Sequence, residues 1–221
     1  EIDLDSCQVR CNVELEDGQG YVWVRIVGWT DWIFKCPAAV AECLRSPAEF
    51  CLAGEVHLPG LPSGSVCTLL PTGVLENMPF GDVLERTFLQ AAELQELDVI
   101  GDSEQRRRVL CSRIAVKDAA RLWQMRTCGG ELLHPAAFAL CHDARGRPYF
   151  DPTAGPRLPQ VSLSHTDTAA IALVSAEPMG VDIERIGRDV AGLLTDFATP
   201  EEIGLLNPLA GAQPQEEWPT R

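Results

Sequence analysis

Residues 104–126 constrain the fold more than any other segment, because this long run contains neither glycine nor proline and is rich in Ala, Arg, Leu and Gln. Ser103 is a candidate N-cap, and Gly129-Gly130 ends the run. The sequence therefore predicts one long helix. It carries seven of the chain's 18 Lys and Arg residues: Arg106, Arg107, Arg108, Arg113, Lys117, Arg121 and Arg126.

The basic residues of this helix are concentrated on one side. Arg106, Arg113, Lys117 and Arg121 are spaced by seven, four and four positions, so they share a helix face. The whole chain has a net charge of −14, which argues against a general nucleic-acid binder. A one-sided basic helix in so acidic a chain suggests an anionic partner, and a merely solvated face is the alternative.

The N-terminal region has the pattern of a β-hairpin. Apolar and polar residues alternate strictly over 7–15, which indicates a half-buried strand, and 21–27 form a second β-rich run. Turn residues at 16–20 connect the two runs. A short helix over about 38–46 and a helix over about 81–96 are also expected.

Four further strands are predicted in the second half of the chain. They cover 138–141, 161–165, 169–175 and 181–185, and a turn over 142–148 follows the first. Beyond them, Thr199 and Pro200 have the pattern of a helix start, with the helix continuing to 206.

Asp182 and Glu184 are two residues apart in the last of these strands. Positions i and i+2 of a strand face the same way and lie roughly 6.6–7 Å apart. Both carboxylates can therefore point to one side while Val181 and Ile183 enter the core. Such a pair suits Mg²⁺, which favours hard oxygen ligands and keeps room for water and phosphate. An ordinary exposed strand face is the alternative.

Three other polar residues are candidates, and one of them, His165, could border one cleft with the two carboxylates. Ser164-His165 ends the strand run before the hairpin whose next strand carries the carboxylates. Arg147, in Gly-Arg-Pro, is either an ordinary turn residue or a fork of donors for phosphate. A lone His is more often structural than catalytic, so these residues remain candidates.

Several segments together resemble a known family. In order, 160–165 (Gln-Val-Ser-Leu-Ser-His), 179–184 (Met-Gly-Val-Asp-Ile-Glu) and 197–202 (Phe-Ala-Thr-Pro-Glu-Glu) resemble successive motifs of the large, pseudo-dimeric class of 4′-phosphopantetheinyl transferases. The basic helix at 112–123 and the turn at 146–148 resemble the same family, particularly members fused to the end of multidomain polyketide synthases. The resemblance covers about residues 104–206.

A shorter resemblance concerns the N-terminal region. Residues 28–34 (Gly-Trp-Thr-Asp-Trp-Ile-Phe) resemble the closing strands of a dehydratase-type hot-dog domain of a polyketide synthase. The catalytic His and Asp of such a dehydratase would lie before Glu1, so no dehydratase chemistry is assigned to this chain.

The transferase resemblance implies a substrate, a metal and a set of ligands. Asp182 and Glu184 would bind Mg²⁺ together with the coenzyme A pyrophosphate. Four residues would contact coenzyme A: Ser164 and His165 at its 3′-phosphoadenosine end, and Arg113 and Arg147 at its phosphates. In the family's reaction, a serine of an acyl carrier protein attacks the β-phosphorus, receives phosphopantetheine and releases adenosine 3′,5′-bisphosphate.

One family motif is missing from the sequence. The family has a later Trp-x-x-Lys-Glu-Ala motif that supplies the third metal ligand and the base, and none follows Glu202. Residues 216–221 resemble the stretch that precedes it, so we expect either a truncated or a degenerate domain with little activity of its own. The alternatives are a non-catalytic scaffold that docks carrier domains and a thioester-binding hot-dog module within 1–100.

The expected fold class is α+β. We expect 1–57 to be the C-terminal part of a dehydratase-like hot-dog domain, 58–103 a connector, and 104–221 an incomplete phosphopantetheinyl transferase domain with antiparallel strands. The nine cysteines are odd in number and include no Cys-x-x-Cys pair, which favours free thiols in a reducing cytoplasm. No apolar run approaches the roughly 18 residues that a membrane span needs.

Overall fold

The computed structural model describes residues 2–3, 8–32, 36–76, 81–152, 158–185 and 199. The described residues form helices and antiparallel strands, which confirms the α+β class. The chain divides into two units, Glu1–Ala41 and Glu42–Arg221, and the division falls inside α1 (Ala38–Arg45). This differs from the boundaries expected after residues 57 and 103.

The first unit contains a three-stranded antiparallel sheet with the order β1-β2-β3. Its strands are β1 (Ile2–Asp3), β2 (Gln8–Glu16) and β3 (Val22–Trp32), so the hairpin prediction is confirmed. The register shifts between Cys11 and Val13, opposite Gly28. Gly28 has φ +73°, a conformation that glycine adopts readily, and its N–H donates to Asn12 Oδ1 at 2.9 Å.

The second unit is built on a four-stranded antiparallel sheet with the order β4-β5-β9-β8. The strands are β4 (Gly54–Glu55), β5 (Val66–Pro71), β9 (Ala169–Ser175) and β8 (Gln160–His165). The predictions of β8 and β9 are confirmed. In contrast, β5 pairs with β9 although it lies in the stretch expected to be a connector.

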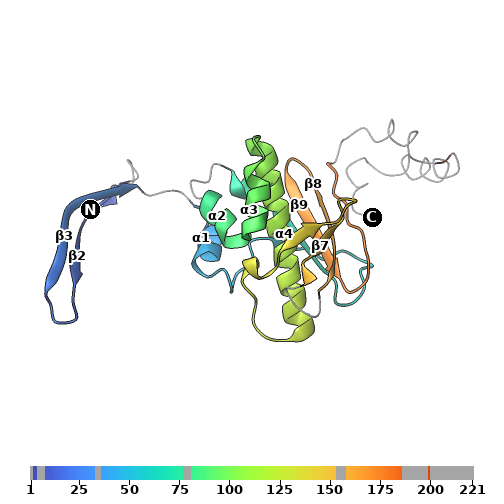
Figure 1. Ribbon diagram of the computed structural model, residues 1–221, viewed down its shortest axis with the longest axis horizontal. Coiled ribbons are helices and arrows are strands. Elements are labelled where there is room, and N and C mark those ends of the chain that lie inside the picture. The colour runs from blue at the N-terminus through green and yellow to red at the C-terminus, as the bar shows by residue number, and fades with distance from the viewer. Residues whose placement is uncertain are drawn as a thin grey trace. The chain divides into compact units, whose positions relative to one another are not determined.

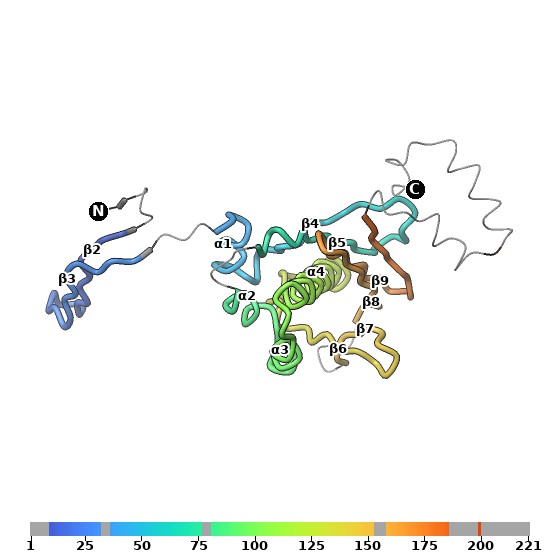
Figure 2. Tube along the Cα trace, turned by 90° about the horizontal axis from the view of Figure 1, so that it is seen from above, coloured from blue at the N-terminus to red at the C-terminus, as the bar shows by residue number. Residues whose placement is uncertain are grey.

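The long helix α4 (Ser103–Cys128) covers one face of this sheet (Figure 1). Thr68 Oγ1 donates to the carbonyl of Ala115 at 2.8 Å, which shows that the Thr68 side of β5 faces the helix. Its partner across the sheet is Ala172, which is fully buried. Figure 2 looks nearly along α4, with β5 and β9 on one side of the helix and α3 (Ala91–Asp98) on the other.

The opposite face of the sheet has its own apolar cluster. Successive strand residues point to opposite faces, so Cys67, Ile171 and Leu173 point away from α4. Several partly buried residues pack against these three: Val56, Leu61, Met179, Val181 and Ile183. The segment that carries the predicted carboxylates is thus fixed to the sheet by its apolar residues.

The short helices differ from the sequence predictions in detail. The helix expected over 81–96 is two helices, α2 (Gly81–Phe88) and α3. Gln90 caps α3, and a capping box with Glu93 starts the second helix. For α4 the N-cap is Asp102, whose carboxylate accepts from the N–H of Glu104, and not Ser103.

The remaining predictions have mixed outcomes. The strands β6 (Leu140–His142) and β7 (Pro148–Phe150) pair on either side of the turn expected at 142–148. The strand predicted at 138–141 begins two residues later, at Leu140. Residues 181–185 are not a strand. The helix predicted over 200–206 lies outside the described residues.

Two findings concern the wider expectations. Eight cysteines of the described part are free thiols, as expected: Cys11, Cys36, Cys43, Cys51, Cys67, Cys111, Cys128 and Cys141. Among the described helices, none combines the length and apolar character that crossing a bilayer requires.

Candidate functional site

Three of the four residues on the basic face of α4 are not presented to solvent. Lys117 and Arg121 are completely buried, and Arg113 is 5 % exposed. For these three residues both interpretations are therefore wrong: they form neither a solvated face nor a surface for an anionic partner. Arg106, the fourth residue of the face, is partly exposed and pairs with Glu85 and Asp98. The helix is basic because its interior side is paired with acidic and carbonyl groups of the same unit.

Each buried cation has several internal partners. Lys117 Nζ lies 2.6 Å from Glu93 Oε2 and donates to the carbonyl of Phe88 at 2.7 Å. Burial lowers the pKa of Lys117, and the Glu93 carboxylate acts in the opposite direction. Arg121 Nη1 lies 2.6 Å from Asp118 Oδ1. The other Asp118 oxygen accepts from two backbone N–H groups, those of Leu52 and Ala53.

Arg113, expected to hold phosphate, is used in the same way. Its guanidinium donates to the carbonyl of Glu93 at 2.9 Å and pairs with the Glu96 carboxylate. Both partners belong to α3, on the side of α4 away from the sheet. Asp182 belongs to the segment on the far face of that sheet. We therefore remove Arg113 from the candidate site.

Ser164 and Asp182 are brought together directly. Ser164 Oγ donates to Asp182 Oδ1 at 2.6 Å and accepts from the N–H of Ile183 at 3.4 Å. Two positions earlier on the same face of β8, Ser162 Oγ accepts from the N–H of Val181 at 3.0 Å. These three hydrogen bonds hold residues 181–183 against β8 through side chains instead of a strand ladder.

The segment keeps the alternation that the sequence predicted, without being a strand. Val181 and Ile183 are half-buried against the apolar cluster, whereas Asp182 and Glu184 are exposed. The two carboxylate residues therefore lie on the solvent side of the segment.

His165 lies on the other face of β8 from Ser164, because the two residues are consecutive in the strand. It pairs with Ala170, whose side of β9 faces α4. His165 is exposed at the end of the strand. Ser164 and His165 consequently do not point into one hollow, although both lie on β8, which ends the order β4-β5-β9-β8.

Arg147 lies between two adjoining hollows of about 360 Å³ each. Both are lined by Arg147, Pro148 and Val161. The first extends to Asp143 and Gln160, and the second is closed by residues 178–180, directly before the carboxylate segment. The structure thus brings the predicted Arg147 turn next to the start of that segment.

The Arg147 turn is held by local hydrogen bonds. Asp143 Oδ1 accepts from the N–H groups of Arg147 and Arg145, and these bonds, that of Arg147 first, lower the pKa of Asp143. Gly146 has φ +78°, which lets the chain turn there. Arg147 Nη2 donates to Gln160 Oε1 at 3.1 Å, which links the turn to β8.

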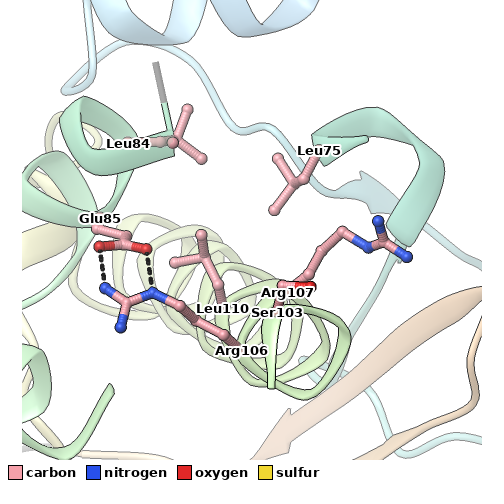
Figure 3. A pocket seen from close by; sticks show the side chains of 8 residues that line it. Leu75, Leu84, Glu85, Ser103, Arg106, Arg107 and Leu110 are labelled. Carbon is pink, nitrogen blue, oxygen red and sulfur yellow. Dashed lines mark hydrogen bonds and ion pairs between the residues drawn. The ribbon is translucent and has the colours of Figure 1, made fainter. Parts of the chain in front are cut away.

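A third hollow, of about 330 Å³, lies at the start of α4 (Figure 3). There Arg106 forms two hydrogen bonds with Glu85, at 2.9 and 2.7 Å. The guanidinium of Arg107 points away from that pair. Its buried Nε has no hydrogen-bond partner within the described part of the chain.

The carboxylate pair fits a magnesium ion as a partial ligand set. Within the described ranges, no group of three His, Cys, Asp or Glu residues could hold a metal. Mg²⁺ in nucleotide sites is commonly bound by one or two carboxylates, with phosphates and water completing its shell. Asp182 and Glu184 are exposed oxygen donors of this kind, so a metal here would be shared with substrate.

Sequence reasoning missed Ser162 and Gln160. The signal for Ser162 was present, because Val-Ser-Leu-Ser places two hydroxyls on one strand face. What these hydroxyls bind depends on a segment nearly twenty residues later, which no local pattern reveals. The partner of Gln160 is Arg147, which lies 13 residues earlier in the sequence.

Comparisons with known proteins gave structural matches only. Neither a protein-family model nor a protein with a curated description matches the sequence. A solved holo-(acyl-carrier-protein) synthase of Bacillus anthracis str. Ames, in complex with CoA (3′,5′-ADP), is similar with a TM-score of 0.43 and 19% identity, over 50% of this chain and 92% of that one. Holo-[acyl-carrier-protein] synthase (AcpS) of Neisseria meningitidis is similar with a TM-score of 0.41 and 22% identity, over 52% of this chain and 98% of that one.

Proposed function

We propose that this chain belongs to a 4′-phosphopantetheinyl transferase that uses Mg²⁺ and coenzyme A to modify a serine of an acyl carrier protein. The hydrogen bond from Ser164 to Asp182 carries the proposal. It joins two of the segments that resemble the family, 160–165 and 179–184, at one place on the surface. The Arg147 turn, which belongs to another resembling segment (146–148), lines hollows beside them.

The proposed ligand roles follow from exposure and charge. Asp182 and Glu184 would hold Mg²⁺, and Arg147 would donate to a coenzyme A phosphate from the rim of the two hollows. When bound, the metal would supply positive charge to the transferring phosphoryl group. In a chain with a net charge of −14, a polyanionic substrate needs such local positive charge to bind.

Ser164 and His165, the other two coenzyme A ligands that the resemblance implies, lie on opposite faces of β8. Ser164 would act beside Asp182, and His165 would contact the 3′-phosphoadenosine end from the other face of β8. Arg113 is used internally, so it is not proposed as a coenzyme A ligand. The chain's own contribution is then to orient the phosphates and position the attacking serine.

We further infer that the carrier belongs to a polyketide synthase and that residues 1–57 include the end of a hot-dog domain. The β2–β3 hairpin and the resemblance of 28–34 support this inference. Residues 33–35 lie outside the described ranges. Modification of a polyketide-type carrier in preference to a fatty-acid-type carrier would support it, and equal rates on both would contradict it.

Calorimetry of coenzyme A binding tests the site directly. We expect binding by the 221-residue chain to depend on Mg²⁺ and to be lost in Asp182→Asn, because Glu184 would then be the one carboxylate of the segment left to hold the metal. Glu131→Gln, an exposed carboxylate in the loop after α4, is the matched control and should bind normally. Equal binding with and without Mg²⁺ would contradict the metal site.

A carrier-labelling assay separates transfer from docking. In the full-length parent protein, Mg²⁺-dependent transfer of phosphopantetheine from coenzyme A to a carrier serine supports the enzyme, and Asp182→Ala should abolish the label. A non-catalytic scaffold that docks carrier domains is the second candidate. It would bind the carrier equally well in the presence and absence of coenzyme A and leave it unlabelled.

A further inference from the structure

The segment that carries Asp182 is attached to β8 in an unusual way. β8 pairs with β9 along one side and closes the sheet order β4-β5-β9-β8. Residues 181–183 run beside it without forming a ladder, so their backbone N–H groups need other acceptors. Two serine hydroxyls of β8 supply these acceptors.

The spacing of the two serines matches the spacing of the groups they hold. Ser162 and Ser164 are two residues apart on one strand face, and they accept from Val181 and Ile183, which are also two residues apart. The two segments therefore lie in fixed register. A shift by one residue would turn Asp182 toward the sheet and Val181 toward solvent.

Ser164 has a further role because a hydroxyl has a single proton to donate. That proton is given to Asp182 Oδ1 at 2.6 Å, while the hydroxyl oxygen accepts from Ile183. The bond fixes Oδ1 of the Asp182 carboxylate and does not involve Oδ2. With its proton used in this way, Ser164 cannot also donate to a phosphate.

We infer that Ser162 and Ser164 form a serine clasp that positions Asp182 for the metal, and that Ser164 is a positioning residue instead of a ligand of the 3′-phosphate. The inference rests on the proposed function for the identity of the metal and the substrate. The geometry of the clasp itself does not depend on either.

Amide hydrogen exchange tests the clasp without metal or substrate. In the 221-residue chain, Ser162→Ala should speed exchange at the Val181 N–H, and Ser164→Ala at the Ile183 N–H, by about fivefold to tenfold, as expected for the loss of one ordinary hydrogen bond. Ser162→Thr and Ser164→Thr keep the hydroxyl and should restore protection. Unchanged exchange in both alanine variants would overturn the clasp.

Binding of Mg²⁺ and of coenzyme A then tests whether the clasp positions Asp182 for the metal. Ser164→Ala should weaken Mg²⁺ binding about tenfold, as loss of a group that orients a ligand typically does. The ratio of affinities for coenzyme A and 3′-dephospho-coenzyme A should stay constant, because the 3′-phosphate is not a partner of Ser164. A reduced ratio with unchanged Mg²⁺ affinity would overturn the positioning role.

The two readouts also separate this inference from the proposed function. If the unmodified chain binds neither Mg²⁺ nor coenzyme A, the proposed function fails, while exchange at Val181 and Ile183 still decides the clasp. If the chain binds both and exchange is insensitive to the serines, the clasp alone fails.

Discussion

Two regions of the second unit carry closely spaced charged residues, which are buried in one region and exposed in the other. On the interior side of α4, Lys117, Asp118 and Arg121 are completely buried and paired with groups of the same unit. In the segment after β9, Asp182 and Glu184 are exposed. The difference teaches that clustered charge indicates a partner only when the fold itself leaves the charge accessible.

The two regions should therefore respond to different changes. Groups inside the unit should control the free energy of unfolding, because an unpaired buried charge costs several kcal/mol. Groups in the 181–184 segment should control ligand binding and change stability little. Four measurements can break or sharpen this contrast.

Alkaline pH should have the largest effect, through three thiols around α4. Burial raises the pKa of Cys43 to about 11, and those of Cys51 and Cys111 to about 12, from 9.0. Between pH 9 and about 11 the unfolded chain loses protons that the folded chain keeps, so stability falls as pH rises. Each thiol contributes a slope of up to about 1.4 kcal/mol per pH unit.

Urea unfolding at stepwise pH measures this slope. Cys111→Ala should make the alkaline loss of stability less steep, whatever it does to stability at pH 7. Cys128 is exposed, and Cys128→Ala is the matched control with an unchanged profile. A profile that is flat from pH 8 to 11 would contradict the buried-thiol account.

Removal of Asp118 should have the next largest effect. Asp118→Ala leaves Arg121 without its carboxylate and the N–H groups of Leu52 and Ala53 without acceptors. We expect a loss of about 3–5 kcal/mol in the free energy of unfolding, which chemical denaturation would measure. A loss below about 1 kcal/mol, comparable to that of an exposed ion pair, would erase the contrast between the two regions.

Asp182→Asn should show the reverse behaviour. Its side chain is exposed, and the amide oxygen can still accept from Ser164, so the free energy of unfolding should stay within about 0.5 kcal/mol. Mg²⁺ binding, measured by calorimetry on the same sample, should be lost. A large loss in the free energy of unfolding of Asp182→Asn would show that this carboxylate contributes mainly to stability.

The smallest effect is expected at the end of the same segment. Arg185 Nη1 lies 2.8 Å from Asp167 Oδ2, and their side chains are 63% and 52% exposed. Arg185→Ala should change the free energy of unfolding by less than about 0.5 kcal/mol, because exposed ion pairs contribute little. A larger loss by thermal or urea unfolding would show that the segment depends on this pair.

Local patterns in the sequence predicted the elements whose signal is complete within the element. The long α4, the β2–β3 hairpin and β9 are of this kind. β5 was missed because its pairing partner lies about a hundred residues later. The spacing of Arg113, Lys117 and Arg121 correctly placed them on one face, but spacing cannot tell which face a helix turns inward.

The candidate site was predictable in its residues more than in its contacts. Alternation in Val-Asp-Ile-Glu correctly placed the apolar residues inward and the carboxylates outward, even though 181–185 is not a strand. The bond between Ser164 and Asp182 joins separate elements and could not be read from either one. His165 was grouped with Ser164 by adjacency, yet consecutive strand residues face opposite sides.

Glu93 shows how tightly such an interior limits change. One oxygen of its carboxylate accepts from the N–H of Gln90 and holds Lys117, and the other lies 3.4 Å from the N–H of Leu140. A single side chain thus joins the start of α3, the middle of α4 and the edge of β6. Shortening it to aspartate would withdraw the carboxylate from all three at once, so one small substitution would disturb three separate elements.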